Sequence, residues 1–368
     1  MNNQISEYPY HGVEVSYENK PAGITLSGTL TLPSTTTTES PFPVAILIAG
    51  MGPVDRDGTN YYGRKPSFVL ADHLTKQGIA VLRSDKRGVG KSTGVFDQAV
   101  TCQDLADDVL AGIAYLKTRK EIDPSQIGLI GHSEGGLVAT MVATDSNDIA
   151  FTVLTAGALV NDVQSVVAQT ASQLKKDGAS AEIIKQDSII RSKILELIKQ
   201  ESDSLQAENQ AQQLFAEHWL CALSENQKKE TEPLLFAFSQ TKFESRIKFM
   251  NSVYYRFMLK YDSLSALARI HGPLLVLYGE LDFMAPEIVI PPIKMAMEKS
   301  KNRDYTILEL PKINHSLQTG VTGSLAEYAT IQETIAPLAL QTISDWILKR
   351  VTKLIENNNS EVANSDSK

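Results

Sequence analysis

One ten-residue segment, Ile127–Gly136, limits the possible folds of this chain more than any other feature. It reads Ile-Gly-Leu-Ile-Gly-His-Ser-Glu-Gly-Gly, so an apolar stretch runs into a serine between glycines, and helix-compatible residues follow. This order predicts a buried strand, a sharp turn and a helix, with Ser133 at the apex. Gly131 and Gly135 flank the serine because so tight a turn leaves no room for a Cβ atom. The turn presents the serine hydroxyl above the sheet, where it can act as a nucleophile.

The composition is that of a globular protein with a full hydrophobic core. The 368 residues are 42% hydrophobic and 21% charged, which suits one α/β domain with an insertion or two domains. The net charge is -8 and no basic stripe stands out, so we expect no nucleic-acid partner. No apolar run reaches about eighteen residues, and residues 1–12 lack the apolar core of a signal peptide. We therefore expect no membrane partner and a cytoplasmic location, with Cys102 and Cys221 reduced.

The order of apolar patterns predicts an α/β fold. Alternation over Ile24–Leu32, and more weakly over Val13–Tyr17, indicates an antiparallel hairpin. Val44–Ala49 is continuously apolar, as in a strand covered on both faces. Strand and helix signals then alternate, which predicts a mostly parallel sheet with helices on both faces. The further predicted strands are Ile79–Leu82, Phe151–Leu154, Leu274–Tyr278 and Tyr305–Leu310, and the predicted helices are Phe68–Gln77, Thr101–Arg119 and Leu338–Ile355.

A long segment interrupts this alternation. Residues 158–264 contain helical patterns rich in Gln, Lys, Glu and Ser and no convincing strand, with enough aromatic residues to pack. We interpret it as a helical cap insertion over the sheet. The predicted organisation is a core segment 1–157 that starts with the hairpin, the insertion 158–264, a second core segment 265–356 and a disordered polar tail 357–368.

A serine nucleophile needs a general base, and the base needs an acid to orient it. In this type of sheet the acid and the base follow later strands, in the order Ser, Asp or Glu, His. Glu280 and Asp282 follow the next-to-last predicted strand, and His315 follows the last one. A turn at a strand end points residues two apart in different directions, so only one of the two carboxylates can face His315, and we favour Asp282. The predicted catalytic residues are Ser133, Asp282 and His315.

The other histidines are poorer candidates for the base. His132 is next to the nucleophile, and we expect its side chain to point elsewhere. The remaining four do not follow the last sheet strand and are expected to be surface or packing residues: His11, His73, His218 and His271.

The tetrahedral intermediate of acyl transfer carries an oxyanion, which two backbone N–H groups usually stabilise. The residue after the nucleophile, Glu134, supplies one of them. The second is expected in the loop after the first buried strand, Gly50-Met51-Gly52-Pro53. The glycines on either side of Met51 let its N–H turn toward the substrate, so Met51 is the predicted second donor.

Arg87–Ser92 ends in Gly-Lys-Ser, as a phosphate-binding loop does. That motif requires glycine where Asp85 stands and a helix from the lysine onward, but Thr93–Phe96 is a poor helix start. We therefore expect no nucleotide binding. No Cys or His pair has the spacing of metal ligands, so we also expect no metal.

Five segments together resemble the α/β-hydrolase superfamily, from Gly28 to Ile355 apart from the insertion. They are Gly50–Pro53, Arg87-Gly88-x-Gly90-x-Ser92, the turn at Ser133, Gly279–Asp282 and Asn314–His315. More narrowly, Gly50–Gly58 with Gly131–Gly136 resembles a group of bacterial esterases that are similar to dienelactone hydrolases and prolyl oligopeptidases. The resemblance implies an eight-stranded, mostly parallel sheet, a Ser133–Asp282–His315 triad and no cofactor. The chain lacks the His-Gly-Gly-Gly of hormone-sensitive lipases, which argues against that type of chemistry.

Arg56 and Asp57 follow the loop at Met51 and have two possible roles. Arg56 can grip a carboxylate or phosphate of the substrate, which makes both residues candidates for substrate binding. Alternatively, an Arg–Asp pair braces the loop.

These features favour a serine carboxylesterase (EC 3.1.1.-) acting on a small-molecule acyl ester. An alternative keeps the triad but cleaves an acyl-CoA thioester or a peptide amide. An aminopeptidase needs a carboxylate in the cap for the substrate ammonium, whereas CoA favours basic residues there. Candidates for the latter are Lys175, Lys176, Lys185, Lys228 and Lys229. A remote alternative is a catalytically silent binding protein with the same fold.

Overall fold

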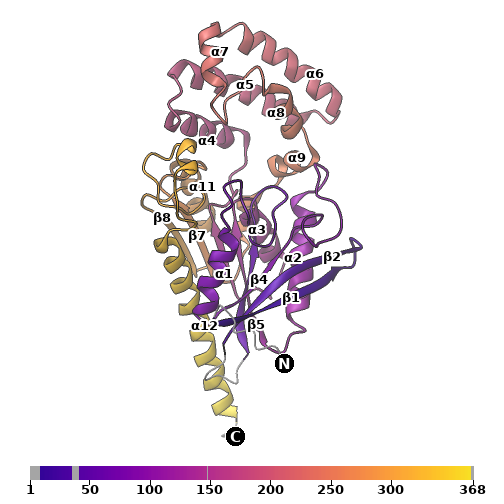
Figure 1. The fold of residues 1–368 in the computed structure, drawn as a ribbon, viewed down its shortest axis with the longest axis vertical. Helices are drawn as coiled ribbons and strands as arrows, with labels where there is room; N and C mark the ends of the chain where they lie inside the picture. The colour runs from indigo at the N-terminus through magenta and orange to yellow at the C-terminus, as the bar shows by residue number, and fades with distance from the viewer. Residues whose placement is uncertain (1–8, 35–40, 147, 366–368) are drawn as a thin grey trace.

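A single mixed sheet organises the chain in the computed structural model, which describes residues 9–34, 41–146 and 148–365. Within these residues the sheet has eight strands in the order β1-β2-β4-β3-β5-β6-β7-β8 (Figure 1). β1 and β2 form an antiparallel hairpin, β2 is antiparallel to β4, and the other neighbouring pairs are parallel. The predicted mostly parallel eight-stranded sheet is confirmed. The strands are β1 Tyr10–Asn19, β2 Ile24–Pro33, β3 Phe42–Ile48, β4 Ala80–Ser84, β5 Ile122–His132, β6 Phe151–Thr155, β7 Leu274–Gly279 and β8 Tyr305–Leu310.

Helices cover both faces of the sheet, which explains why β3 is apolar at successive positions. Val44 and Ile46 pack on one face with α2, α3, α10 and α11, while Ala45 between them packs on the other face with α1 and α12. Side chains alternate across a strand, so a strand buried on both faces needs apolar residues throughout. These helices are α1 Pro66–Lys76, α2 Cys102–Leu116, α3 Glu134–Asp145, α10 Ser263–Ala268, α11 Pro286–Lys299 and α12 Pro337–Ser365.

The start of α2 shows how local sequence determines a helix boundary. The backbone N–H of Thr101 donates to the carboxylate of Asp104 at 2.8 Å, and the Asp104 N–H donates back to the Thr101 hydroxyl. This capping box satisfies two N–H groups that a helix end leaves without partners. The spacing of the two residues in the sequence is therefore sufficient to predict the helix start.

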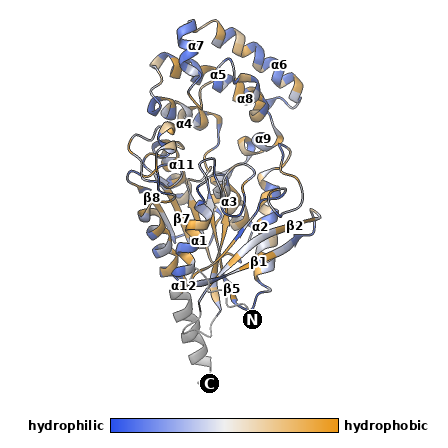
Figure 2. Cartoon of the chain, viewed as in Figure 1, coloured by the Kyte–Doolittle hydropathy of each residue, from blue (hydrophilic) through white to orange (hydrophobic). Residues whose placement is uncertain are grey.

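The described residues between β6 and β7 form helices and loops, of which α4 to α9 lie beyond the carboxyl ends of the strands (Figure 1). This helical insertion has a hydrophobic core of its own, which includes Phe215, Trp219, Phe238 and Phe243. Its outer helices α6 and α7 are largely hydrophilic, in contrast to the central strands (Figure 2). The helices are α4 Val163–Lys176, α5 Ala181–Gln200, α6 Ser204–Phe215, the π-helix η1 Ala216–Leu220, α7 Glu225–Thr231, α8 Phe243–Met250 and α9 Val253–Lys260.

The C-terminal end differs from the prediction. Helix α12 continues to Ser365, whereas the sequence analysis expects a disordered tail from Asn357. No proline or glycine follows Asn357 to stop the helix, and polarity alone does not end one. Residues 366–368 of that tail, and residues 1–8 of the segment considered for a signal peptide, lie outside the described residues. Across the described ranges, no helix combines the length and apolar character needed to cross a bilayer.

The contact between β5 and β6 leads to a stability prediction. Gly128 is paired with Phe151, and a Cβ atom at position 128 would lie 2.2 Å from the Phe151 ring. We expect Gly128→Ala to lower the free energy of unfolding by about 2 kcal/mol because it overpacks a filled core. Urea denaturation measures the change. In the Gly128→Ala background, Phe151→Leu should recover part of the lost free energy of unfolding. Equal urea midpoints for Gly128→Ala and the unchanged protein would contradict the packing argument.

Candidate active site

Ser133 occupies a tight turn between β5 and α3. Its backbone angles are φ 55° and ψ -119°, which residues with a side chain rarely adopt. The turn is held because the Ser133 N–H donates to the carbonyl of Thr155 at 3.0 Å and the Ser133 carbonyl accepts from Gly136 at 2.9 Å. A Cβ atom on Gly131 would lie 2.1 Å from the carbonyl oxygen of Gly135. The packing of strand against helix therefore excludes a side chain at position 131, as predicted.

The loops after β7 and β8 bring a carboxylate to a histidine. Nδ1 of His315 lies 2.7 Å from Oδ1 of Asp282, whose side chain is fully buried. A buried carboxylate at this distance holds the imidazole in one orientation. Glu280, the other acid considered, is exposed and accepts a hydrogen bond from the N–H of Lys312 at 2.8 Å. The geometry therefore selects Asp282 as the partner of His315.

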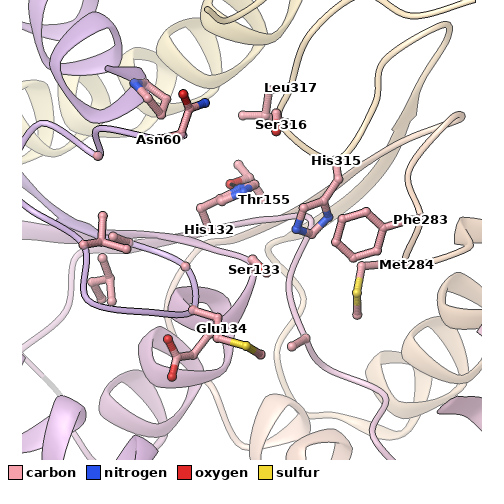
Figure 3. A pocket seen from close by; sticks show the side chains of 18 of the residues that line it. Asn60, His132, Ser133, Glu134, Thr155, Phe283, Met284, His315, Ser316 and Leu317 are labelled. Atoms are coloured by element: carbon pink, nitrogen blue, oxygen red, sulfur yellow. Dashed lines mark hydrogen bonds between the residues drawn. The ribbon is translucent and has the colours of Figure 1, made fainter. Parts of the chain in front are cut away.

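A cavity of about 580 Å³ lies between the sheet and the helical insertion. Ser133 and His315 both line it, as do Met51 and Glu134, the two residues predicted to stabilise an oxyanion. The His315 ring lies beside Ser133, with Phe283 on the other side of the ring (Figure 3). The centroids of the His315 and Phe283 rings are 3.9 Å apart. Serine, histidine and predicted oxyanion donors thus share one cavity.

A lysine orients the peptide group between Gly50 and Met51. Nζ of Lys86 donates to the Gly50 carbonyl oxygen at 2.6 Å. The described residues include no cis peptide bond, so the N–H of Met51 points opposite to that carbonyl, away from Lys86. A Cβ atom at position 50 would lie 3.2 Å from Cβ of Ser133, which shows how close this peptide is to the serine. An N–H beside the serine and turned away from its anchoring lysine suits an oxyanion donor.

The same lysine is paired with the side chain of Glu134. Lys86 Nζ and Glu134 Oε2 are 2.8 Å apart, and the Glu134 side chain is 1% exposed. Sγ of Cys102 lies 4.0 Å from the other carboxylate oxygen, and burial raises the pKa of this thiol well above its usual range. Lys86 therefore connects the loop after β3 to the residue after the serine. The sequence analysis missed this role of Lys86. A glutamate next to the buried turn at Ser133, which we call the elbow, nevertheless signals that a cation lies nearby.

Arg56 and Asp57 are not in the cavity, which corrects the prediction that they bind substrate. The Arg56 guanidinium donates to Asp85 at 2.7 Å and to Glu14 at 2.8 Å. Asp57 accepts from Arg83, and from Lys65 at 3.1 Å. These ion pairs support the bracing role instead, because they tie the loop after β3 to β1 and to the end of β4.

The segment Arg87–Ser92 also has a structural role. Arg87 is paired with Asp108 of α2 at 2.8 Å, and a Cβ atom on Gly90 would lie 2.5 Å from the Asp85 carboxylate. The glycine therefore gives close approach to a side chain rather than to a phosphate. In the part of the chain whose side chains are described, no three His, Cys, Asp or Glu residues are grouped as a metal site requires.

His132 differs from expectation, because its ring lines the cavity instead of pointing away from it. Its centroid is 5.0 Å from that of His315, and its Nδ1 lies 3.2 Å from the hydroxyl of Thr155. Burial, with a smaller contribution from His315, lowers the pKa of His132 to about 3. The ring is therefore neutral at neutral pH and adds no positive charge next to His315.

Known proteins share both sequence and fold with this chain. The sequence pattern of the family described as Serine aminopeptidase, S33, matches residues 60–231, which include the elbow and end before Asp282. Esterase EstD of Thermotoga maritima is 31% identical over 142 residues, which are 38% of this chain and 32% of EstD. The aligned stretch thus spans about a third of that relative.

Two solved structures match nearly the whole chain. The α/β hydrolase GrgF of Penicillium sp. sh18 has a TM-score of 0.54 at 18% identity, covering 93% of this chain and 99% of GrgF. This likeness shows that the chain has the α/β-hydrolase fold. The Pf2001 esterase of Pyrococcus furiosus has a TM-score of 0.52 at 17% identity, covering 95% of each chain. In this fold, the elbow and the loops after β3, β7 and β8 meet at the carboxyl edge of the sheet.

The low pKa of His132 predicts a pH dependence of stability. The folded protein keeps this ring neutral, while the unfolded chain protonates it below about pH 6.5. Protonation therefore favours the unfolded chain as the pH falls from about 6.5 toward 3. Between pH 7.5 and 5.5, the unchanged protein should lose about 1.4 kcal/mol more unfolding free energy than His132→Asn, which does not titrate. Urea denaturation at both pH values measures this difference, and equal losses would refute it.

The buried Lys86–Glu134 pair predicts a large effect of removing its cation. Lys86→Met leaves the Glu134 carboxylate buried without a counter-charge, which should cost about 3–5 kcal/mol of unfolding free energy. Lys91→Met is the matched control, because Lys91 is exposed and pairs with exposed Glu14, a contact that contributes about 0–1 kcal/mol. Adding Glu134→Gln to Lys86→Met should restore part of the stability. Equal destabilisation by Lys86→Met and Lys91→Met would contradict this account.

Proposed function

We propose that this α/β hydrolase is a serine carboxylesterase. The observation that carries the proposal is the 2.7 Å contact between Asp282 and His315 on the wall of the cavity that Ser133 also lines. In the proposed first step, His315 accepts the Ser133 proton as the hydroxyl attacks the ester carbonyl. Asp282 orients the imidazole and stabilises the imidazolium that forms. The names of EstD and the Pf2001 esterase agree with ester cleavage.

The tetrahedral intermediate is stabilised by the backbone N–H groups of Met51 and Glu134, each contributing on the order of 3 kcal/mol. His315 then donates its proton to the leaving alkoxide, which departs as the alcohol and leaves an acyl group on Ser133. Water attacks the acyl carbon with His315 again as base. The acid leaves, and the Ser133 hydroxyl is restored.

The helical insertion serves as a cap that shapes the acyl pocket. Part of the cavity wall comes from α4, α5, α8 and α9. Substrates must therefore fit between the sheet edge and these helices, which favours small-molecule esters. Cys102 and Cys221 are both unpaired, which agrees with a cytoplasmic location for the enzyme.

Aminopeptidase activity is the second candidate, because the matched family is described as Serine aminopeptidase, S33. An aminopeptidase needs a carboxylate to bind the substrate ammonium. Glu134 lines the cavity but is paired with Lys86, while Arg191 and Arg246 give the insertion side of the wall a positive charge. A positive wall repels an ammonium group, so the ester is favoured over the peptide.

The lysines considered for CoA binding do not support a thioesterase. The cavity lining includes none of Lys175, Lys176, Lys185, Lys228 and Lys229. Lys176 instead donates to the backbone carbonyl of Asp282 at 3.1 Å. A catalytically silent binding protein is also disfavoured, since such proteins usually lose a triad residue and all three positions are filled here.

Kinetics on three substrates with one short acyl group test the proposal: an aryl ester, a CoA thioester and an aryl amide. We expect fast turnover of the ester and little of the other two. Ser133→Ala and Asp282→Asn should each lower kcat for the ester at least about 1,000-fold, because the triad acts as a unit.

Glu280→Gln is the matched control for Asp282→Asn, because Glu280 is the exposed acid two residues away. It should retain the activity of the unchanged protein. If Ser133→Ala cleaves the ester as fast as the unchanged protein, the proposed nucleophile is wrong. Faster cleavage of the amide than of the ester would favour the peptidase alternative instead.

A further inference from the structure

Two arginines of the helical insertion line the same cavity as Ser133. Arg191 lies on α5 and Arg246 on α8. Both guanidinium groups donate to one acceptor, the carbonyl oxygen of Phe236. Two cations that share an acceptor lie within a few ångströms of each other, so they act as one positive site on the wall.

Aromatic rings connect this positive site to the proposed catalytic base. The Phe236 ring lies against Phe283, with centroids 5.3 Å apart, and the centroids of Phe283 and His315 are 3.9 Å apart. Two apolar rings thus connect the arginines to His315. A substrate reaching from Ser133 to the arginines must carry an apolar stretch and then a polar end.

Asp187 is ion-paired with only one of the two arginines, although its charge also acts on Arg246 and opposes the fall in the pKa of that group. Asp187 Oδ1 accepts from Nε of Arg191 at 2.7 Å, and its other oxygen accepts from the backbone N–H of Phe238. Among the described residues, Arg246 has no ion-pair partner, and its Nη atoms donate to the carbonyls of Leu235 and Phe236. The faces of the Phe238 ring lie 4.5 and 5.8 Å from the two guanidinium carbons, but a ring face carries only a partial charge.

Arg246 also retains hydrogen-bonding capacity. Its Nε atom is buried and has no acceptor among the described residues. Burial, and then the charge of Arg191, lower the pKa of Arg246 to about 10. The guanidinium therefore stays charged at neutral pH, although its surroundings disfavour the charge. A half-buried cation with no ion-pair partner of its own is costly, and an anion in the cavity would accept from the Nη N–H groups of Arg246 that are not used for Leu235 and Phe236.

We propose that Arg246, with Arg191, binds an anionic group of the substrate, a carboxylate at the end of the ester remote from the scissile bond. The inference rests on the proposed esterase function and narrows its substrates to half-esters of dicarboxylic acids or esters of carboxylated alcohols. The carboxylate would accept hydrogen bonds from the planar guanidinium, which suits two carboxylate oxygens. Glu134 is paired with Lys86, so no described carboxylate on the cavity wall is free to repel such a substrate.

A purely structural role is the competing explanation, because Arg246 also fastens the backbone at Leu235 and Phe236. That role predicts lower stability or lower turnover for all esters alike. Substrate binding instead predicts a change that depends on the charge of the substrate. The ratio of kcat/KM between charged and neutral substrates separates the two.

Two matched substrate pairs distinguish where the carboxylate sits. The mono-4-nitrophenyl ester of adipic acid and 4-nitrophenyl hexanoate differ in charge at the end of the acyl chain. The hexanoyl esters of 4-hydroxybenzoic acid and 4-hydroxybenzamide differ in charge on the leaving group. In the unchanged protein, the charged member of one pair should have the higher kcat/KM, which identifies the side of the ester that faces the arginines.

Arg246→Met should lower that charged-to-neutral ratio by about 10- to 100-fold, the range expected for one charged hydrogen-bonding group. Arg246→Lys keeps the charge and should lower it less. Lys248→Met is the matched control, because it removes an exposed charge from the same helix, and its ratio should equal that of the unchanged protein. An unchanged ratio in Arg246→Met for both pairs would overturn the inference.

Adipate binding to the unchanged protein tests the anion site without a variant that has to fold and without ester turnover. Calorimetry should show that adipate binds the unchanged protein at least about ten times more tightly than hexanoate. Equal affinities would overturn the inference even if Arg246→Met does not fold. Ser133-dependent turnover of neutral esters without a charge preference would refute only the anion site. Adipate binding without turnover of any ester would refute only the proposed function.

Discussion

The close packing of backbone against backbone at the elbow is the constraint on which the rest of the site depends. β3, β5 and α3 approach so tightly that a Cβ atom on Gly135 would lie 2.1 Å from the carbonyl oxygen of Ile48. This contact places the serine turn directly beside the loop after β3. Ser133 can hold its unusual backbone angles because main-chain hydrogen bonds on both sides leave it no alternative.

Buried charges then position the loops around this turn. Lys86 bonds both the Gly50 carbonyl and the Glu134 carboxylate, so the two predicted oxyanion donors share one anchor. Arg56 ties the loop after β3 to Asp85, next to Lys86 in the chain. Each loop is irregular and has few backbone partners of its own, so these ion pairs give it a single conformation.

The helical insertion supplies the part of the cavity that distinguishes this chain from a bare α/β-hydrolase core. It has its own hydrophobic core around Trp219, while Tyr254 and Met258 of α9 pack into the core of the sheet. The inner wall of the insertion carries charged side chains of one sign facing the cavity, Arg191 and Arg246, while the sheet side carries Ser133 and His315. The proposed catalytic residues and the proposed anion site thus lie on different walls of one cavity.

The sequence by itself determined the features that near neighbours in the chain control. Strand alternation, the capping box at Thr101 and the glycines of the elbow are local, so the sheet, the start of α2 and the position of Ser133 could be predicted. Local turn geometry predicted that only one of Asp282 and Glu280 faces His315, and the folded structure places Asp282 there. Only the tertiary structure decided the roles of Arg56, His132, Lys86 and Arg246, because their partners lie on segments far away in sequence. A side chain's charge is visible in a sequence, but whether it meets a counter-charge depends on long-range packing.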